Sequence, residues 1–167
     1  MKAAIQIFLS NFPLIMLILS FLIAFSKREG FFNRLLVSQL ILTVGLCGIW
    51  GFIMHAFFSQ ITSDYIGWTQ SPFEYEVATA NLGIGISGII AAFSSYSYRK
   101  ATITFVSIFL LGAAFGHIYQ IHTAHNLLPG NAGTILWTDI FIPIFLWIAL
   151  IGARKSKKTY GFLPTNE

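Results

Sequence analysis

Residues 35–57 read LLVSQLILTVGLCGIWGFIMHAF, and no Asp, Glu, Lys or Arg interrupts them. A helix that crosses the hydrocarbon core of a bilayer needs about 20 consecutive, mostly apolar residues. Backbone N–H and C=O groups in lipid must be satisfied within their own segment, so this run predicts a membrane-spanning α-helix. A transmembrane β-barrel would instead show alternating segments of about ten residues.

Four further stretches have the same apolar character, namely residues 3–25, 73–93, 101–121 and 135–152. Charged residues make up only 10% of the 167-residue chain and hydrophobic residues 56%, whereas a typical soluble domain carries about 25% charged residues. The sequence therefore predicts an all-α integral membrane helical bundle of about five transmembrane helices. In this interpretation residues 1–153 form a single transmembrane domain and residues 154–167 a basic cytoplasmic tail.

Basic residues occur in every second connection between the expected spans. They are Lys27, Arg28 and Arg34, then Arg99 and Lys100, and finally Arg154, Lys155, Lys157 and Lys158 in the tail. The connections at residues 58–72 and 122–134 contain no Lys or Arg. Because basic residues mark the cytoplasmic side, we expect the N-terminus outside, the C-terminus in the cytoplasm, and a multi-pass protein of the bacterial inner membrane.

The same distribution limits the classes of partner. The basic residues are divided among three short segments, so they do not form a nucleic-acid footprint. The only cysteine, Cys47, excludes an internal disulfide framework and a cysteine-based zinc cluster. The expected partner is the lipid bilayer, with a second copy of the chain or another membrane subunit as further candidates.

Four ionisable residues fall about one helical turn inside the boundary that is expected to be the outer one: His55, Glu76, His117 and Asp139. Each belongs to a different span. Ionisable residues inside spans are costly and usually face the bundle interior or a cavity. We therefore expect an outward-facing polar layer, to which Asn131 and Gln120 would also contribute.

The residues leave several roles open for this layer. It can be a satisfied network of His–carboxylate pairs that ties the helices together. It can be a divalent metal site for Zn²⁺, Mn²⁺ or Fe²⁺, with His55, Glu76, His117 and Asp139 as ligands, although no closely spaced pair such as HExxH supports this. It can also be a proton or ion path, or a pocket for a small ligand.

Catalytic and cofactor motifs give little further guidance. The chain lacks a G-x-S-x-G elbow, a Walker A loop and a C-x-x-C-H haem motif. We therefore assign no catalytic residue and favour a non-enzymatic role. Haem is disfavoured as a cofactor, and the identity of any cofactor stays unknown. The leading hypothesis is binding or passage of a cation, proton or small polar ligand. The alternatives are a non-catalytic subunit that scaffolds a partner complex, and a haem- or quinone-binding redox protein.

Small residues recur along the second, third and fourth spans, at Gly45, Gly48 and Gly51, at Gly83, Gly85 and Gly88, and at Gly112 and Gly116. Such residues typically mark the faces where membrane helices pack closely. The sequence of residues 83–88 matches G-x-G-x-x-G, but it lies inside an apolar span and has no βαβ unit around it. Glu74, at the start of the third span, is explained by the helix dipole alone.

Several short motifs resemble an uncharacterised family of small bacterial polytopic membrane proteins. They are Gly67-Trp68, SPFEYEV at residues 71–77, ANLG at residues 80–83, GAAFGHIYQ at residues 112–120, PGNAG at residues 129–133, and Asp139. The resemblance covers about residues 65–150. It implies a membrane location and a multi-span architecture, and it implies no chemistry. Glu76, His117, Asn131 and Asp139 lie within the matching segments.

Overall fold

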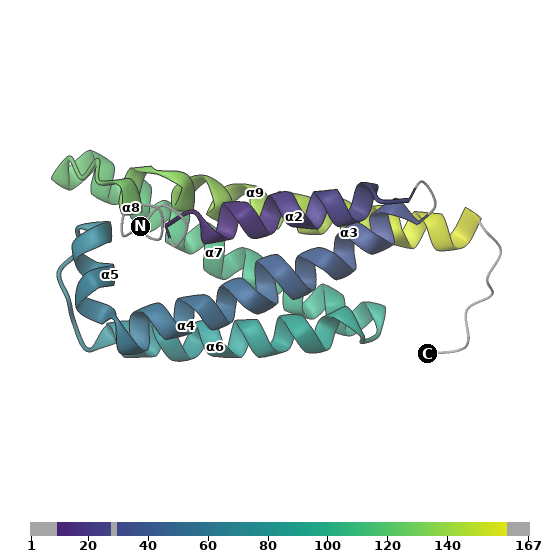
Figure 1. Ribbon diagram of the computed structural model, residues 1–167, viewed down its shortest axis with the longest axis horizontal. Coiled ribbons are helices and arrows are strands. Elements are labelled where there is room, and N and C mark those ends of the chain that lie inside the picture. Colours follow the sequence, from purple (N-terminus) through teal and green to yellow (C-terminus); the bar gives the residue numbers. More distant parts are fainter. Residues whose placement is uncertain (1–9, 28–29, 160–167) are drawn as a thin grey trace.

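The protein is an elongated bundle of helices that run side by side (Figure 1). The structure is a computed structural model that describes residues 10–27 and 30–159. Within these residues it contains helices, turns and short connections and no β-strand. The all-α helical bundle expected from the sequence is confirmed.

Five long helical stretches make up the bundle. The first is α2 (Phe12–Phe25), and the second is one continuous helix built from α3 (Phe31–Gln39), the π-helical segment η1 (Leu40–Leu46) and α4 (Cys47–Phe57). The others are α6 (Phe73–Ala92), α7 (Tyr96–Ala124) and α9 (Thr134–Thr159). Two short helices, α5 (Ser59–Ile66) and α8 (Pro129–Ala132), lie in the connections.

Four of the described helical stretches are long and apolar enough to cross a membrane: Phe31–Phe57, Phe73–Ala92, Tyr96–Ala124 and Pro129–Lys155. The fifth, α2, is a shorter apolar helix, and residues 3–9 of the first expected span lie outside the described residues. The architecture is that of a multi-pass membrane protein.

The structure differs from the expected spans at three places. The second span contains a π-helical segment that its hydropathy does not indicate. Helix α7 begins at Tyr96 instead of residue 101, because the Ser95 side chain caps it and accepts a hydrogen bond from the backbone N–H of Tyr98 at 3.4 Å. Helix α9 continues to Thr159, through the basic residues of the expected tail.

Two arginines close the hairpins at one end of the bundle. Arg34 on α3 donates from Nε and Nη2 to the carbonyl oxygen of Ala24, at 3.2 and 3.0 Å. Arg99 on α7 donates to the carbonyl oxygens of Ala91 and Ala92, at 3.1 and 2.8 Å. The last carbonyls of a helix lack partners within it, so each arginine satisfies the end of the preceding helix.

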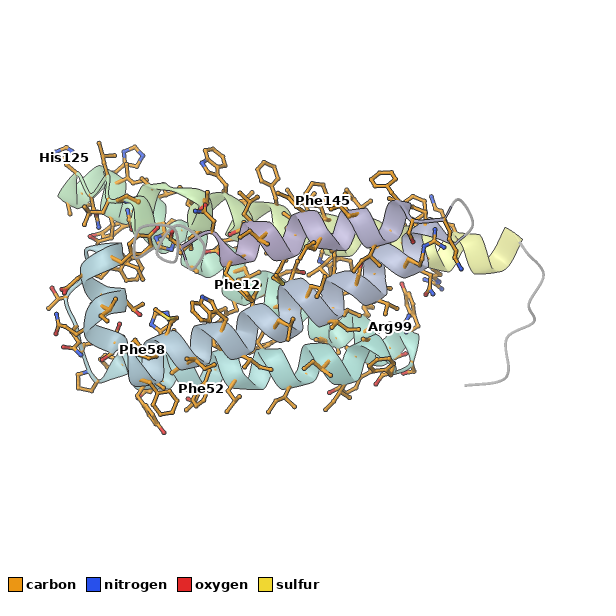
Figure 2. All side chains as sticks on the ribbon, in the orientation of Figure 1. Phe12, Phe52, Phe58, Arg99, His125 and Phe145 are labelled. Atoms are coloured by element: carbon orange, nitrogen blue, oxygen red, sulfur yellow. The ribbon has the colours of Figure 1, made fainter. Side chains whose placement is uncertain are left out.

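The apolar core is concentrated toward the same end. Its most deeply buried large side chains come from α3, η1, α7 and α9: Leu35, Leu36, Leu40, Ile103, Leu146 and Leu150. Figure 2 labels Arg99 at this end and His125 at the other, where α5 and α8 lie (Figure 1). The polar residues discussed below belong to the end that carries α5 and α8.

Helix α6 touches the continuous helix of η1 and α4 backbone to backbone. A Cβ atom added to Gly48 would lie 2.6 Å from the backbone nitrogen of Gly85, and one added to Gly85 would lie 2.8 Å from the carbonyl oxygen of Gly45. These glycines are the packing positions that the sequence predicts. A Cβ atom on Gly83 or Gly112 meets nothing within 4 Å, so the prediction is wrong for those two.

The close approach predicts a difference between two glycines of the same helix. The methyl group of Gly85→Ala must push α4 and α6 apart, and overpacking of this kind typically costs about 1–3 kcal/mol. We expect circular dichroism of the detergent-solubilised protein to show a lower melting temperature.

The matched control is Gly83→Ala, which adds the same methyl group to α6 in open space. Because alanine favours a helix over glycine by about 1 kcal/mol, this variant should melt at the same temperature or slightly higher. An equal decrease in melting temperature in both variants would contradict the backbone contact between the helices.

Candidate functional site

A cavity of about 1420 Å³ lies between the helices toward the end that carries α5 and α8. Ligand pockets typically measure about 300–1,000 Å³, so the space is ample for an organic molecule. Its wall is mostly apolar and comes mainly from α4, α5, α6, α7 and α9, with a few residues from α2, η1 and α8. Four ionisable side chains of the spans line it in two pairs, one on α4 and α6 and the other on α7 and α9.

The first pair joins α4 to α6. The Nδ1 atom of His55 lies 3.6 Å from Oε1 of Glu74, and the Ser63 hydroxyl of α5 donates a hydrogen bond to the same oxygen at 2.8 Å. The other carboxylate oxygen, Oε2, is buried and has no hydrogen-bond partner within the described part of the chain. Glu74 therefore presents an unsatisfied acceptor beside the cavity.

The second pair joins α7 to α9. The Nε2 atom of His117 lies 3.9 Å from Oδ2 of Asp139, and the two side chains are only 6% and 12% exposed. Asp139 lies in the second turn of α9, within the mostly apolar sequence ILWTDIFI. A carboxyl group so placed is costly unless it faces a polar group or a cavity, and Asp139 faces both.

Asn131 on α8 holds the second pair in place. It is fully buried, and its Oδ1 atom accepts hydrogen bonds from Nε1 of Trp68 and from Nδ1 of His117, both at 2.9 Å. Its Nδ2 atom donates to the carbonyl oxygens of His117 and Asn126, at 3.2 and 2.9 Å. One amide thus links α7, α8 and the connection that follows α5.

The structure brings together some of the residues predicted for the polar layer and separates others. His117, Asp139 and Asn131 form one cluster, and His55 lies in the other pair. Glu76 is exposed and does not line the cavity. Gln120 is half-buried and outside the cavity wall, and its backbone carbonyl accepts the N–H of Asn126 where α7 ends.

The arrangement also bears on the metal hypothesis for His55, Glu76, His117 and Asp139. Among residues 10–27 and 30–159, no group of three or more His, Cys, Asp and Glu side chains is placed to hold a metal ion. The four predicted ligands are divided between the two pairs and, in the case of Glu76, the exposed surface.

Sequence reasoning missed two residues of this site. Glu74 lines the cavity in place of Glu76, and helical periodicity could have shown this, because Glu74 shares a face with Ala78, Asn81 and Gly85 at spacings of four, seven and eleven residues. Trp68 looks like a residue of the interfacial aromatic belt. Its ring instead packs against His117, with centroids 5.2 Å apart.

The Gly112 and Gly116 pair of α7 also belongs to the site. Both residues line the cavity, and a Cβ atom on Gly116 would lie 3.1 Å from the ring of Trp68. The sequence predicts a helix-packing face at these two glycines. In the structure Gly116 instead accommodates the ring of Trp68, and Gly112 borders the open volume of the cavity.

The network around Asn131 predicts a large loss of stability in Asn131→Ala. The substitution leaves the ring nitrogens of Trp68 and His117 and the carbonyl of Asn126 without this partner, and each unsatisfied buried group costs about 1–3 kcal/mol. Thermal melting in detergent should show a strongly lowered midpoint.

Asn81→Ala is the control, because among the described residues the Asn81 amide donates only within its own helix, to the carbonyl oxygen of Val77 at 2.9 Å. A melting temperature lowered as much by this substitution as by Asn131→Ala would argue against the special weight of Asn131.

Comparisons with known proteins add the family. No curated protein and no solved structure matches the chain. A family model described as a family of unknown function, DUF6790, matches residues 10–159. The match includes the first two described helices, which the motifs of residues 65–150 do not cover. The prediction of an uncharacterised membrane protein family is confirmed, and the chain belongs to the DUF6790 family of unknown function.

Proposed function

We propose that this protein binds a small organic cation with an apolar body in the cavity between its helices. The proposal rests above all on the charge of the cavity wall. Among the described residues, three carboxylate residues line it, Asp64, Glu74 and Asp139, and no Lys or Arg of this part of the chain does so. Carboxylate charge that no Lys or Arg of the described wall balances favours a positively charged guest, most of all where the wall is buried and the dielectric constant low.

The rest of the wall suits the body of such a molecule. Aromatic side chains line the cavity beside the polar pairs: Trp50, Tyr65, Trp68, Phe73 and Phe109. Aromatic faces attract cations, especially where water is excluded. The Trp50 ring is held by Phe12 of α2, with centroids 5.3 Å apart, and Phe12 is labelled between α2 and α4 in Figure 2. Apolar walls with a few converging polar groups are typical of small-molecule sites.

The direction of access follows from the basic residues. Arg34 and Arg99 lie at the end of the bundle opposite α5 and α8. If that end is cytoplasmic, as the positive-inside rule indicates, the cavity belongs to the outer half of the membrane. A cation would then enter from outside the cell or from the outer leaflet.

The binding proposal predicts that purified protein in detergent takes up tetraphenylphosphonium. Because Glu74 supplies negative charge to the cavity wall, Glu74→Gln should weaken binding at least tenfold, which corresponds to about 1.4 kcal/mol. Equilibrium dialysis or isothermal titration calorimetry measures the dissociation constant.

Two controls keep the test specific. Glu76→Gln removes the same charge two residues away, on the exposed face of α6, and should bind as the parent does. Tetraphenylborate has the same shape with a negative charge and should not bind. Equal binding of both ions, or equal losses in Glu74→Gln and Glu76→Gln, would overturn the cation proposal. A third variant, Gly112→Leu, fills the cavity without a steric clash at its first side-chain atom and should also weaken binding.

The orientation is tested separately with single cysteines in a Cys47→Ala background. Leu127→Cys lies in the connection before α8 and Ser97→Cys near the start of α7, and both positions are exposed. In intact cells, a membrane-impermeant maleimide should label the cysteine at position 127 and spare the one at position 97. The reverse pattern would place the cavity on the cytoplasmic side.

A further inference from the structure

The hydrogen bonds around Asn131 determine which nitrogen of His117 carries a proton. The indole Nε1 of Trp68 is always a donor, so the Asn131 atom that faces it at 2.9 Å must be the carbonyl oxygen. The amide nitrogen of Asn131 then faces two carbonyl oxygens, as a donor should. This arrangement leaves no freedom to exchange the two ends of the amide.

The same oxygen faces Nδ1 of His117 at 2.9 Å. A carbonyl oxygen can only accept, so Nδ1 must carry a hydrogen. In a neutral imidazole the other nitrogen, Nε2, is then an acceptor with its lone pair free. Trp68 thus fixes the tautomer of His117 through Asn131, although the two side chains share no hydrogen bond of their own within the described residues.

The free nitrogen points toward a second acceptor. Nε2 lies 3.9 Å from Oδ2 of Asp139, in a setting where both side chains are largely buried. A neutral imidazole opposite an ionised carboxylate would place two lone pairs face to face, with a buried negative charge left without compensation. One proton removes the conflict, either on Asp139 as a neutral acid or on His117 as an imidazolium.

We propose that His117 and Asp139 together form a binding site for one proton, and that a cation entering the cavity displaces this proton. The second half rests on the proposed function. On binding, the pair releases this one exchangeable proton to bulk water, while Nδ1 of His117 keeps its hydrogen. The Asp139 carboxylate then becomes the counter-ion of the guest. The protein would then exchange one proton for one monovalent cation.

Among the described residues, the other titratable groups of the cavity wall are few. They are Cys47 and His55 on α4, Asp64 and Tyr65 on α5, and Glu74 on α6. Helices α2 and α8 carry no ionisable side chain, and Arg34 of α3 lies at the opposite end of the bundle. Glu74 has His55 as its own neighbour at 3.6 Å.

Spectroscopy of the protein without any cation tests the proton site. In ¹⁵N-histidine-labelled protein at neutral pH, His117 should show a protonated Nδ1. Infrared spectroscopy should show, in the same sample, either an acid C=O band that is lost in Asp139→Asn or an imidazolium signal from His117. A neutral His117 beside an ionised Asp139, or a His117 protonated only at Nε2, would overturn the site.

Binding of tetraphenylphosphonium tests the exchange. If one proton leaves for each cation, affinity should rise about tenfold per pH unit on the acid side of the pair's titration, and a weakly buffered solution should acidify by one proton per bound ion. Asp139→Asn should lose both the slope and the acidification, whereas Glu76→Gln and His122→Gln, both at exposed positions, should keep them.

The outcomes separate the two ideas. Binding that does not depend on pH, with no proton released, overturns the exchange and leaves the proposed function standing. Absence of tetraphenylphosphonium binding at every pH overturns the proposed function and the exchange together. The proton site itself is then decided by the spectra of the cation-free protein.

Discussion

The buried amide of Asn131 is the constraint on which the polar end of the bundle depends. The Asn131 side chain is fully buried, and a buried polar group that loses its partner is left unsatisfied, so each of the four hydrogen bonds of this amide holds its element in place. They fix the end of α7, the turn at α8 and the indole of Trp68 relative to one another. The wall of the cavity is built from these same elements.

The interior of the bundle is filled differently at its two ends. At the end with the basic residues, leucines, isoleucine and alanines fill the interior and arginines satisfy the helix ends. At the other end the interior holds carboxylates, imidazoles and open volume. A close-packed apolar interior would be the more stable choice there, so the polar pairs are best understood as retained for a task other than stability.

The sequence predicts the gross architecture because its signals are long. Runs of about 20 apolar residues identify spans whatever their neighbours are, and the differences lie mainly at helix ends, where α7 begins early and α9 continues to Thr159. The depth of ionisable residues also identified His55, His117 and Asp139 as members of one end of the bundle. Depth alone could not choose between Glu74 and Glu76, because that choice depends on which face of α6 meets α4.

Other features had no local signal. The link between Trp68, Asn131 and His117 joins residues 14 and 63 positions apart, and no spacing rule connects them. Gly112 and Gly116 resemble a packing motif, and only the position of α7 shows that Gly112 borders the cavity and Gly116 the ring of Trp68. The π-helical segment is likewise a property of the packed bundle, since the sequence LILTVGL contains neither proline nor a charged residue.

The π-helical segment η1 determines how far α4 is rotated about the helix axis relative to α3. In a regular α-helix each residue turns the chain by about 100°, and a π-helical turn accommodates a residue that the regular helix would not. Loss of one residue between Leu40 and Leu46 would leave a helix that still crosses the membrane with Leu35 and Leu36 in the core. It would swing His55 about a quarter turn away from Glu74. A deletion that leaves the hydropathy unchanged would thus keep the membrane span and lose the His55–Glu74 pair. In alignments of this family it would appear only as a one-residue gap.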